Sequence, residues 1–173
     1  IKKWLFLLTL LVLIPLNIAS AQDNDNVLSA QEIETIAAAV VRIETPMATG
    51  SGTIISADGL IFTNRHVIED GGRDFEIYMQ EAVGELPVLQ YHASLIAVFN
   101  ELDFAVLQID RDANGRALDT ATLSLPHIER FAERVSLADP VVIFGYPSIG
   151  DGYLVVTRGS VTSIENATIV GQR

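Results

Sequence analysis

The chain has 173 residues, which is enough for one domain or slightly more, and its net charge at pH 7 is −11. Such an acidic surface repels phosphate backbones, so the composition argues against nucleic-acid binding. The sequence contains no cysteine. The fold therefore has no disulfides and depends on its hydrophobic core.

The first 21 residues have the pattern of a secretory signal peptide. Residues 2–3 are lysines, residues 4–16 form an apolar run, and residues 19–21 read Ala-Ser-Ala, a small-residue cleavage site. The apolar run is shorter than a membrane span requires. We therefore expect export to the periplasm, the cell surface or the medium, with Gln22 as the first mature residue. The alternative is an uncleaved N-terminal anchor.

A short helix is predicted before the first strand. Ser29 and Glu32 have the spacing of a capping box, which indicates a helix that runs to about residue 39. The residues expected on its apolar face are Ile33, Ile36 and Ala37. Residues 40–44 then alternate between apolar and polar side chains, as in a half-buried strand.

A hairpin is predicted next, followed at once by a histidine. Residues 53–56 and 60–63 are short apolar runs with Ala-Asp-Gly between them, and Asp-Gly supplies the positive backbone angles of a tight hairpin. His66 follows where the second strand ends and the chain turns, a place from which a side chain on a rigid scaffold reaches a cleft. Without further context, a structural histidine is the more common interpretation of a residue such as His66.

Short strands dominate the rest of the chain, which predicts an all-β barrel or sandwich. The segment 111–134 is more polar and contains an Asn-Gly turn, so we interpret it as a connection between two barrels. The expected strands are residues 75–79, 86–98, 104–109, 141–144, 154–164 and 168–170.

The stretch around His66 resembles the histidine-bearing segment of trypsin-like serine proteases in their bacterial HtrA/Deg-type form. That form carries a Gly-Ser-Gly strand, an Asp-Gly hairpin and a Thr-Asn-x-His-Val turn, which correspond here to residues 50–52, 58–59 and 63–67. Animal digestive relatives commonly have cysteine after the histidine, whereas Val67 stands here, which favours the cysteine-free bacterial branch. The resemblance implies that His66 is the general base.

Asp103 is the second candidate. It stands directly before the apolar run Phe-Ala-Val-Leu, and taken alone it is a common surface acid at the start of a strand. The resemblance implies that it is the triad aspartate, because it follows His66 in the chain order of trypsin-like proteases. In that role the carboxylate fixes the histidine tautomer and stabilises the imidazolium. We therefore expect Asp103 to be largely buried and within hydrogen-bond reach of His66.

The nucleophile of the family is missing from these residues. Trypsin-like proteases carry their serine in a Gly-x-Ser-Gly-Gly loop after both the histidine and the aspartate, and the same loop supplies the amides of the oxyanion hole. The 173 residues contain no such motif, and Ser51 lies before the histidine. A Gly-x-Pro turn at residues 145–147 and a Thr-x-Gly-x-Val strand at 157–161 extend the resemblance into part of a second barrel.

The resemblance spans residues from about 40 to 170 and implies two trypsin-like Greek-key barrels, the second incomplete. We expect the chain to be an inactive fragment of an exported serine endopeptidase. The predicted organisation is a signal peptide (1–21), a lead and short helix (22–39), a first β-barrel (40–110), an inter-barrel connection (111–134) and a partial second β-barrel (135–173).

The expected partners are polypeptide substrates, unfolded proteins among them. Contact with a membrane is expected only through an uncleaved anchor. We expect no cofactor, and no metal site, because His66, His92 and His127 lack the spacing of metal ligands. A non-catalytic, protease-like module that binds polypeptides is the alternative function, and an anchored structural protein is a further one. A Gly-x-Ser-Gly-Gly motif downstream would favour the enzyme.

Overall fold

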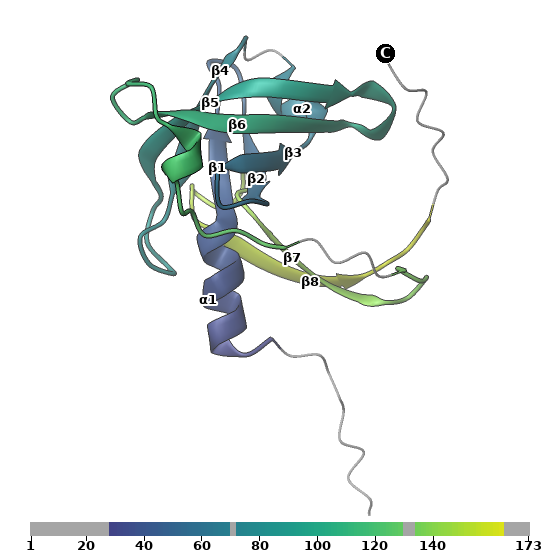
Figure 1. Ribbon diagram of the computed structural model, residues 1–173. Helices are drawn as coiled ribbons and strands as arrows, with labels where there is room; N and C mark the ends of the chain where they lie inside the picture. Colours follow the sequence, from purple (N-terminus) through teal and green to yellow (C-terminus); the bar gives the residue numbers. More distant parts are fainter. Residues whose placement is uncertain (1–27, 70–71, 130–133, 165–173) are drawn as a thin grey trace, which may run out of the picture.

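The computed structural model describes residues 28–69, 72–129 and 134–164 (Figure 1). The predicted signal peptide at 1–21 and the predicted strand at 168–170 lie outside these ranges. Among the described residues, no helix has the length and apolar character needed to cross a membrane. The described part is mostly β-strand, so the prediction of an all-β fold is confirmed.

Helix α1 (Ala30–Ala39) begins with the predicted capping box. The Glu32 carboxylate accepts from the Ser29 backbone N–H at 2.8 Å, and the Ser29 hydroxyl accepts from the Glu32 N–H at 3.3 Å. The helix projects away from the barrel (Figure 1), so its last turn is buried at Ala37 and Ala39 whereas Ile36 is half-buried. The expected apolar face is therefore covered over only part of its length.

Six antiparallel strands form a closed barrel in the order β1-β2-β3-β6-β5-β4. Closure pairs every strand of this sheet on both sides and leaves no open edge for another chain. The predicted strand at 86–98 is one continuous strand, β5, which bends at two bulges. The barrel strands are β1 (Val40–Glu44), β2 (Thr49–Ile54), β3 (Leu60–Thr63), β4 (Asp74–Met79), β5 (Val88–Phe99) and β6 (Phe104–Asp112).

The core of the barrel is made by the inward-facing residues of these strands. Alternation along β4 and β6 places every second side chain inside, as their burial patterns show. Each fully buried large apolar side chain contributes about 1.5–3 kcal/mol. The largest completely buried side chains are Val41, Ile43, Ile54, Ile61, Phe75, Ile77, Leu107 and Ile109.

β2 and β3 form the predicted antiparallel hairpin, but the turn between them differs from the expected Asp-Gly geometry. It spans residues 55–59, and Gly59 has a positive φ of 93° whereas Asp58 does not. The Asp58 carboxylate instead accepts a hydrogen bond from the Ser56 hydroxyl, and the Ser56 hydroxyl accepts from the Leu60 N–H. These side-chain bonds support a backbone turn in which the Gly59 N–H donates to the Ser56 carbonyl at 3.0 Å.

A second, smaller sheet follows the barrel. Its two antiparallel strands are β7 (Pro140–Gly145) and β8 (Val155–Ser160), and β7 lies against β1 and β2 of the barrel (Figure 1). The strand expected at 154–164 therefore ends earlier, at Ser160. Between β6 and this sheet the chain forms a 3-10 turn, η2 (Thr120–Thr122), and inserts Leu125 into the barrel core.

Candidate active site

The two candidate residues meet because their strands are neighbours. β3 pairs with β6, with Thr63 opposite Ala105. His66 follows the end of β3 on a four-residue helix, α2 (Arg65–Ile68), and Asp103 precedes β6 after the 3-10 turn η1 (Asn100–Leu102). Both residues thus lie at the same end of the barrel, with His66 on a short helix where we expected a simple turn.

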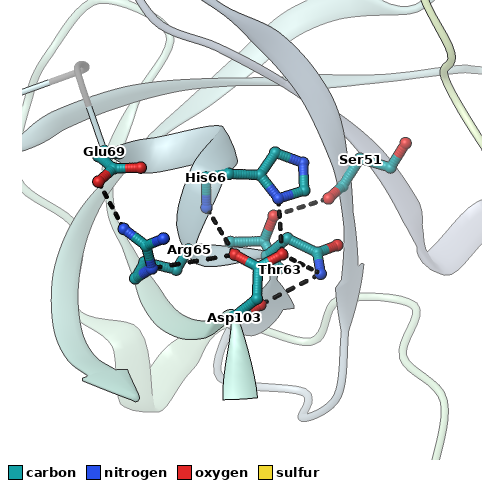
Figure 2. Close-up of polar contacts among 7 residues, drawn as sticks. Ser51, Thr63, Arg65, His66, Glu69 and Asp103 are labelled. Atoms are coloured by element: carbon teal, nitrogen blue, oxygen red, sulfur yellow. Dashed lines mark hydrogen bonds and ion pairs between the residues drawn. The ribbon is translucent and has the colours of Figure 1, made fainter. Parts of the chain in front are cut away.

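His66 and Asp103 form a close side-chain pair (Figure 2). The ring Nδ1 of His66 lies 2.7 Å from Asp103 Oδ2, and the backbone N–H of His66 donates to Asp103 Oδ1 at 3.0 Å. The expected hydrogen-bond contact is present. When Nδ1–H donates to the carboxylate, the neutral ring has its lone pair on Nε2, ready to accept a proton. The His66 side chain is 63% exposed, so the ring is accessible.

The surroundings of Asp103 favour its ionised form. Hydrogen bonds from the His66 ring and from the His66 backbone lower the pKa of the Asp103 carboxyl below its ordinary value. The expectation that Asp103 is largely buried is wrong, because its side chain is 43% exposed. The residue stands at the rim of the barrel, just before the first inward-facing residue of β6, Ala105.

Asp103 has an unusual backbone conformation that its neighbours support. Its φ and ψ are 46° and 49°, in the left-handed region. The Asp103 carbonyl accepts from the Arg65 N–H at 3.1 Å and from the Asn64 side-chain amide at 3.1 Å. The same Asn64 amide lies 3.3 Å from Asp103 Oδ2. Sequence reasoning missed Asn64 as a site residue, although the Thr-Asn-x-His motif contains it.

Arg65 lies between two carboxylates. Its Nη1 is 2.5 Å from Glu69 Oε1 at the C-cap of α2, and its Nε is 4.0 Å from Asp103 Oδ1 (Figure 2). Glu69 therefore engages the guanidinium more closely than Asp103 does. The short contact from Asp103 Oδ2 remains the one to His66.

Ser51 connects the site region to the second sheet. The Thr63 hydroxyl donates to the Ser51 carbonyl at 2.7 Å, and the Ser51 hydroxyl accepts from the Tyr146 backbone N–H at 2.7 Å. A hollow of about 270 Å³ adjoins these groups, and three aromatic side chains line it: Phe62, Phe104 and Phe144. Ser51 therefore has a structural contact that reaches across the two regions.

The two other histidines lie apart from this pair. His92 is on β5, with Nδ1 3.3 Å from Asp74 Oδ1, and the His127 ring lies 3.0 Å from the Leu125 carbonyl. Within the described ranges, no group of three or more His, Cys, Asp or Glu side chains is arranged to hold a metal ion.

The comparisons with known proteins identify the family. A family model described as "Trypsin-like peptidase domain" matches residues 50–172. The chain belongs to the trypsin-like peptidases. Among curated proteins it is 34% identical to Protease Do-like 4, mitochondrial, of Arabidopsis thaliana over 67% of this chain. It is 30% identical to Serine protease HTRA1 of Xenopus laevis over 82% of this chain.

A solved structure supports the same assignment. The serine endoprotease from Yersinia pestis matches with a TM-score of 0.58 and 28% identity, over 79% of this chain and 46% of that one. The closed barrel and the partial second sheet thus correspond to a trypsin-like double barrel. The matched region covers 19% of the Arabidopsis relative and 27% of the Xenopus relative.

Proposed function

We propose that the full-length protein is an exported serine endopeptidase in which His66 is the general base and Asp103 orients it. The observation that carries this proposal is the 2.7 Å contact between His66 Nδ1 and Asp103 Oδ2 on an accessible ring. Membership of the trypsin-like peptidases supports the reaction class. Polypeptides, unfolded proteins among them, are the proposed substrates.

The proposed reaction is peptide hydrolysis through an acyl-enzyme. His66 Nε2 accepts the proton of a serine hydroxyl as the serine oxygen attacks the peptide carbonyl, and His66 then donates this proton to the leaving amine. A water molecule releases the acyl group by the same proton transfers in reverse. Asp103 keeps the ring in the required tautomer and stabilises the imidazolium. This template comes from the same family.

The proposal assigns the nucleophile to a part of the full-length protein outside these 173 residues. They contain no Gly-x-Ser-Gly-Gly motif, and the matched region corresponds to less than half of the Yersinia pestis structure. Ser51 is already engaged as a hydrogen-bond acceptor for Tyr146. Residues 22–173 alone should therefore lack both the nucleophile and the oxyanion amides.

Casein hydrolysis by the full-length gene product and by residues 22–173 tests this proposal. We expect turnover by the full-length protein and none by the shorter chain. His66→Ala should lower kcat by about 10⁶ and Asp103→Asn by about 10⁴, as in serine protease triads. His127→Ala is the matched control, because this histidine lies outside the pair. Its kcat should stay within about twofold of the parent value.

Two outcomes would contradict the mechanism. A His66→Ala variant as active as its parent would show that His66 is not the general base. Turnover by residues 22–173 would show that catalysis needs no serine outside these residues. A folded full-length protein that is inert but binds casein would favour the non-catalytic polypeptide-binding module.

The export part of the proposal rests on the N-terminal sequence. Lysines, an apolar run and the Ala-Ser-Ala site predict cleavage after Ala21. Mass spectrometry of the protein from the periplasm or medium should find Gln22 as the first residue. Peptides that retain Lys2 and Lys3 in the mature protein would contradict cleavage and favour the uncleaved anchor.

A further inference from the structure

We propose that Asn64 is a positioning residue, which holds the Asp103 carboxylate in the rotamer that places Oδ2 on His66 Nδ1. This inference rests on the proposed function, because it assigns Asn64 a role through Asp103 in the same reaction.

Asn64 stands at the N-cap position of α2 but does not cap it. Its backbone is extended, with φ −81° and ψ 146°, as in a normal N-cap residue, yet its side chain makes no capping hydrogen bond. The first N–H groups of the helix are bonded by Asp103 instead. Arg65 N–H donates to the Asp103 carbonyl at 3.1 Å and His66 N–H donates to Asp103 Oδ1 at 3.0 Å. Asp103 thus caps the helix, so the Asn64 side chain is not held at the helix terminus and its amide N–H groups are turned toward Asp103.

The Asn64 amide donates to two groups of Asp103. Its Nδ2 lies 3.1 Å from the Asp103 carbonyl oxygen and 3.3 Å from Oδ2. Because one amide group contacts the backbone and the carboxylate of the same residue, it restrains their relative orientation. A rotation of the carboxylate would break the Asn64 contact and the 2.7 Å His66 contact together.

The backbone of Asp103 explains why such support is useful. Its left-handed conformation, with φ 46° and ψ 49°, is costly for a residue other than glycine and persists when neighbours hold it. The Asp103 side chain is also 43% exposed, so water competes for its oxygens. A fixed donor on the protein limits the orientations that water would otherwise allow.

The number of hydrogen-bond donors on the side chain at position 64 distinguishes a positioning role from a helix-capping role. An Asn amide carries two N–H donors, a Ser hydroxyl carries one on a shorter side chain, and an ionised Asp carries none. As helix caps, however, Ser and Asp are as good as Asn. A capping role therefore predicts that Asn64→Ser and Asn64→Asp are harmless. A positioning role predicts that both are damaging while the melting temperature of Asn64→Ser stays near that of the parent.

The test compares Asn64→Ser, Asn64→Asp and Asn64→Ala in the full-length gene product. We expect Asn64→Ser and Asn64→Ala to lower kcat about tenfold, with KM within about twofold, because one hydrogen bond to a charged group is lost. Asn64→Asp should lower kcat about 100-fold, because a second carboxylate faces Asp103. Asn64→Ser with the kcat of the parent would overturn the inference.

A proton NMR measurement separates this inference from the proposed function. The resonance of the His66 Nδ1 proton reports its bond to Asp103 whether or not the protein turns over substrate. We expect this resonance to weaken by exchange with water in Asn64→Ser and Asn64→Ala. An unchanged resonance in both variants would overturn the positioning role. If His66→Ala keeps full activity, the proposed function fails, while the resonance still decides whether Asn64 holds Asp103.

Discussion

The barrel and the β7–β8 sheet are built from similar residues but bury them very differently. In the barrel, Phe75 and Ile77 have no exposed surface, and each strand is paired on both sides. In the two-stranded sheet, Ile143 is 57% exposed and Val156 is 45% exposed. Closure, rather than apolar content, decides how much each apolar side chain stabilises the fold.

The candidate site lies on the closed barrel and only borders the second sheet. His66 and Asp103 are held by β3 and β6, which are adjacent strands of the closed barrel. The second sheet approaches this region through the hydrogen bond from the Tyr146 N–H to Ser51. The pair is therefore supported by the closed barrel, and the second sheet contacts the barrel at only a few positions of β1 and β2.

The largest expected difference between the regions comes from removing one large apolar side chain in each. Phe75→Ala should lower the free energy of unfolding by about 3–5 kcal/mol, because it empties a fully buried site. Ile143→Ala should change it by less than about 0.5 kcal/mol, because that side chain is mostly exposed. Urea unfolding of residues 22–173 measures both, and equal losses would show that the sheet is packed as tightly as the barrel.

Much of the barrel was predictable from the sequence because its strands are short, alternating and bounded by turns. The capping box at Ser29 and the strand that begins near Phe104 follow directly from local residue patterns. The hairpin between β2 and β3 was predicted, but the backbone conformation of Asp58 was not, because the Ser56 hydroxyl bonds the Asp58 carboxylate. The bulges of β5 likewise depend on its pairing with β4 and β6.

The two candidate catalytic residues could be predicted from the sequence, but their exposure and their hydrogen-bond partners could not. Motifs identified His66 and Asp103, and adjacent strands bring them together. The exposure of Asp103 and the orientation of the Asn64 amide depend on how α2 and η1 meet in space. No residue pattern along the chain predicts how these two elements pack against each other.

A smaller effect is expected at alkaline pH, where the contact between the regions contains a buried tyrosine. Tyr146 is 2% exposed, and burial raises its pKa from 10.0 to about 12. Because the folded state favours the neutral phenol, this stabilisation is complete below pH 10 and is lost as the pH rises through about 12. The loss should reach about 2–3 kcal/mol.

Tyr146→Phe is the control for this pH dependence. The variant should keep its neutral-pH stability, since the Tyr146 hydroxyl has no hydrogen-bond partner among the described residues. Tyr78, whose pKa is also raised to about 12, remains in both proteins, so the difference between them isolates Tyr146. Unfolding curves between pH 9 and pH 12 that coincide for parent and variant would mean that Tyr146 ionises without cost to the fold.

The smallest predicted effect concerns the hydrogen bond that joins the two regions. The Ser51 hydroxyl accepts from the Tyr146 N–H at 2.7 Å, and at Gly145 a β-carbon would lie 2.9 Å from the same oxygen. Ser51→Ala should lower the free energy of unfolding by about 1 kcal/mol. If the sheet depends on this bond, hydrogen exchange at the Tyr146 amide should accelerate about fivefold while amides of β4 stay protected.

Ser160→Ala, at an exposed position at the end of β8, is the matched control and should leave both exchange rates unchanged. Equal acceleration in the barrel and in the sheet would contradict a local contact, because it would mean that the two regions open together.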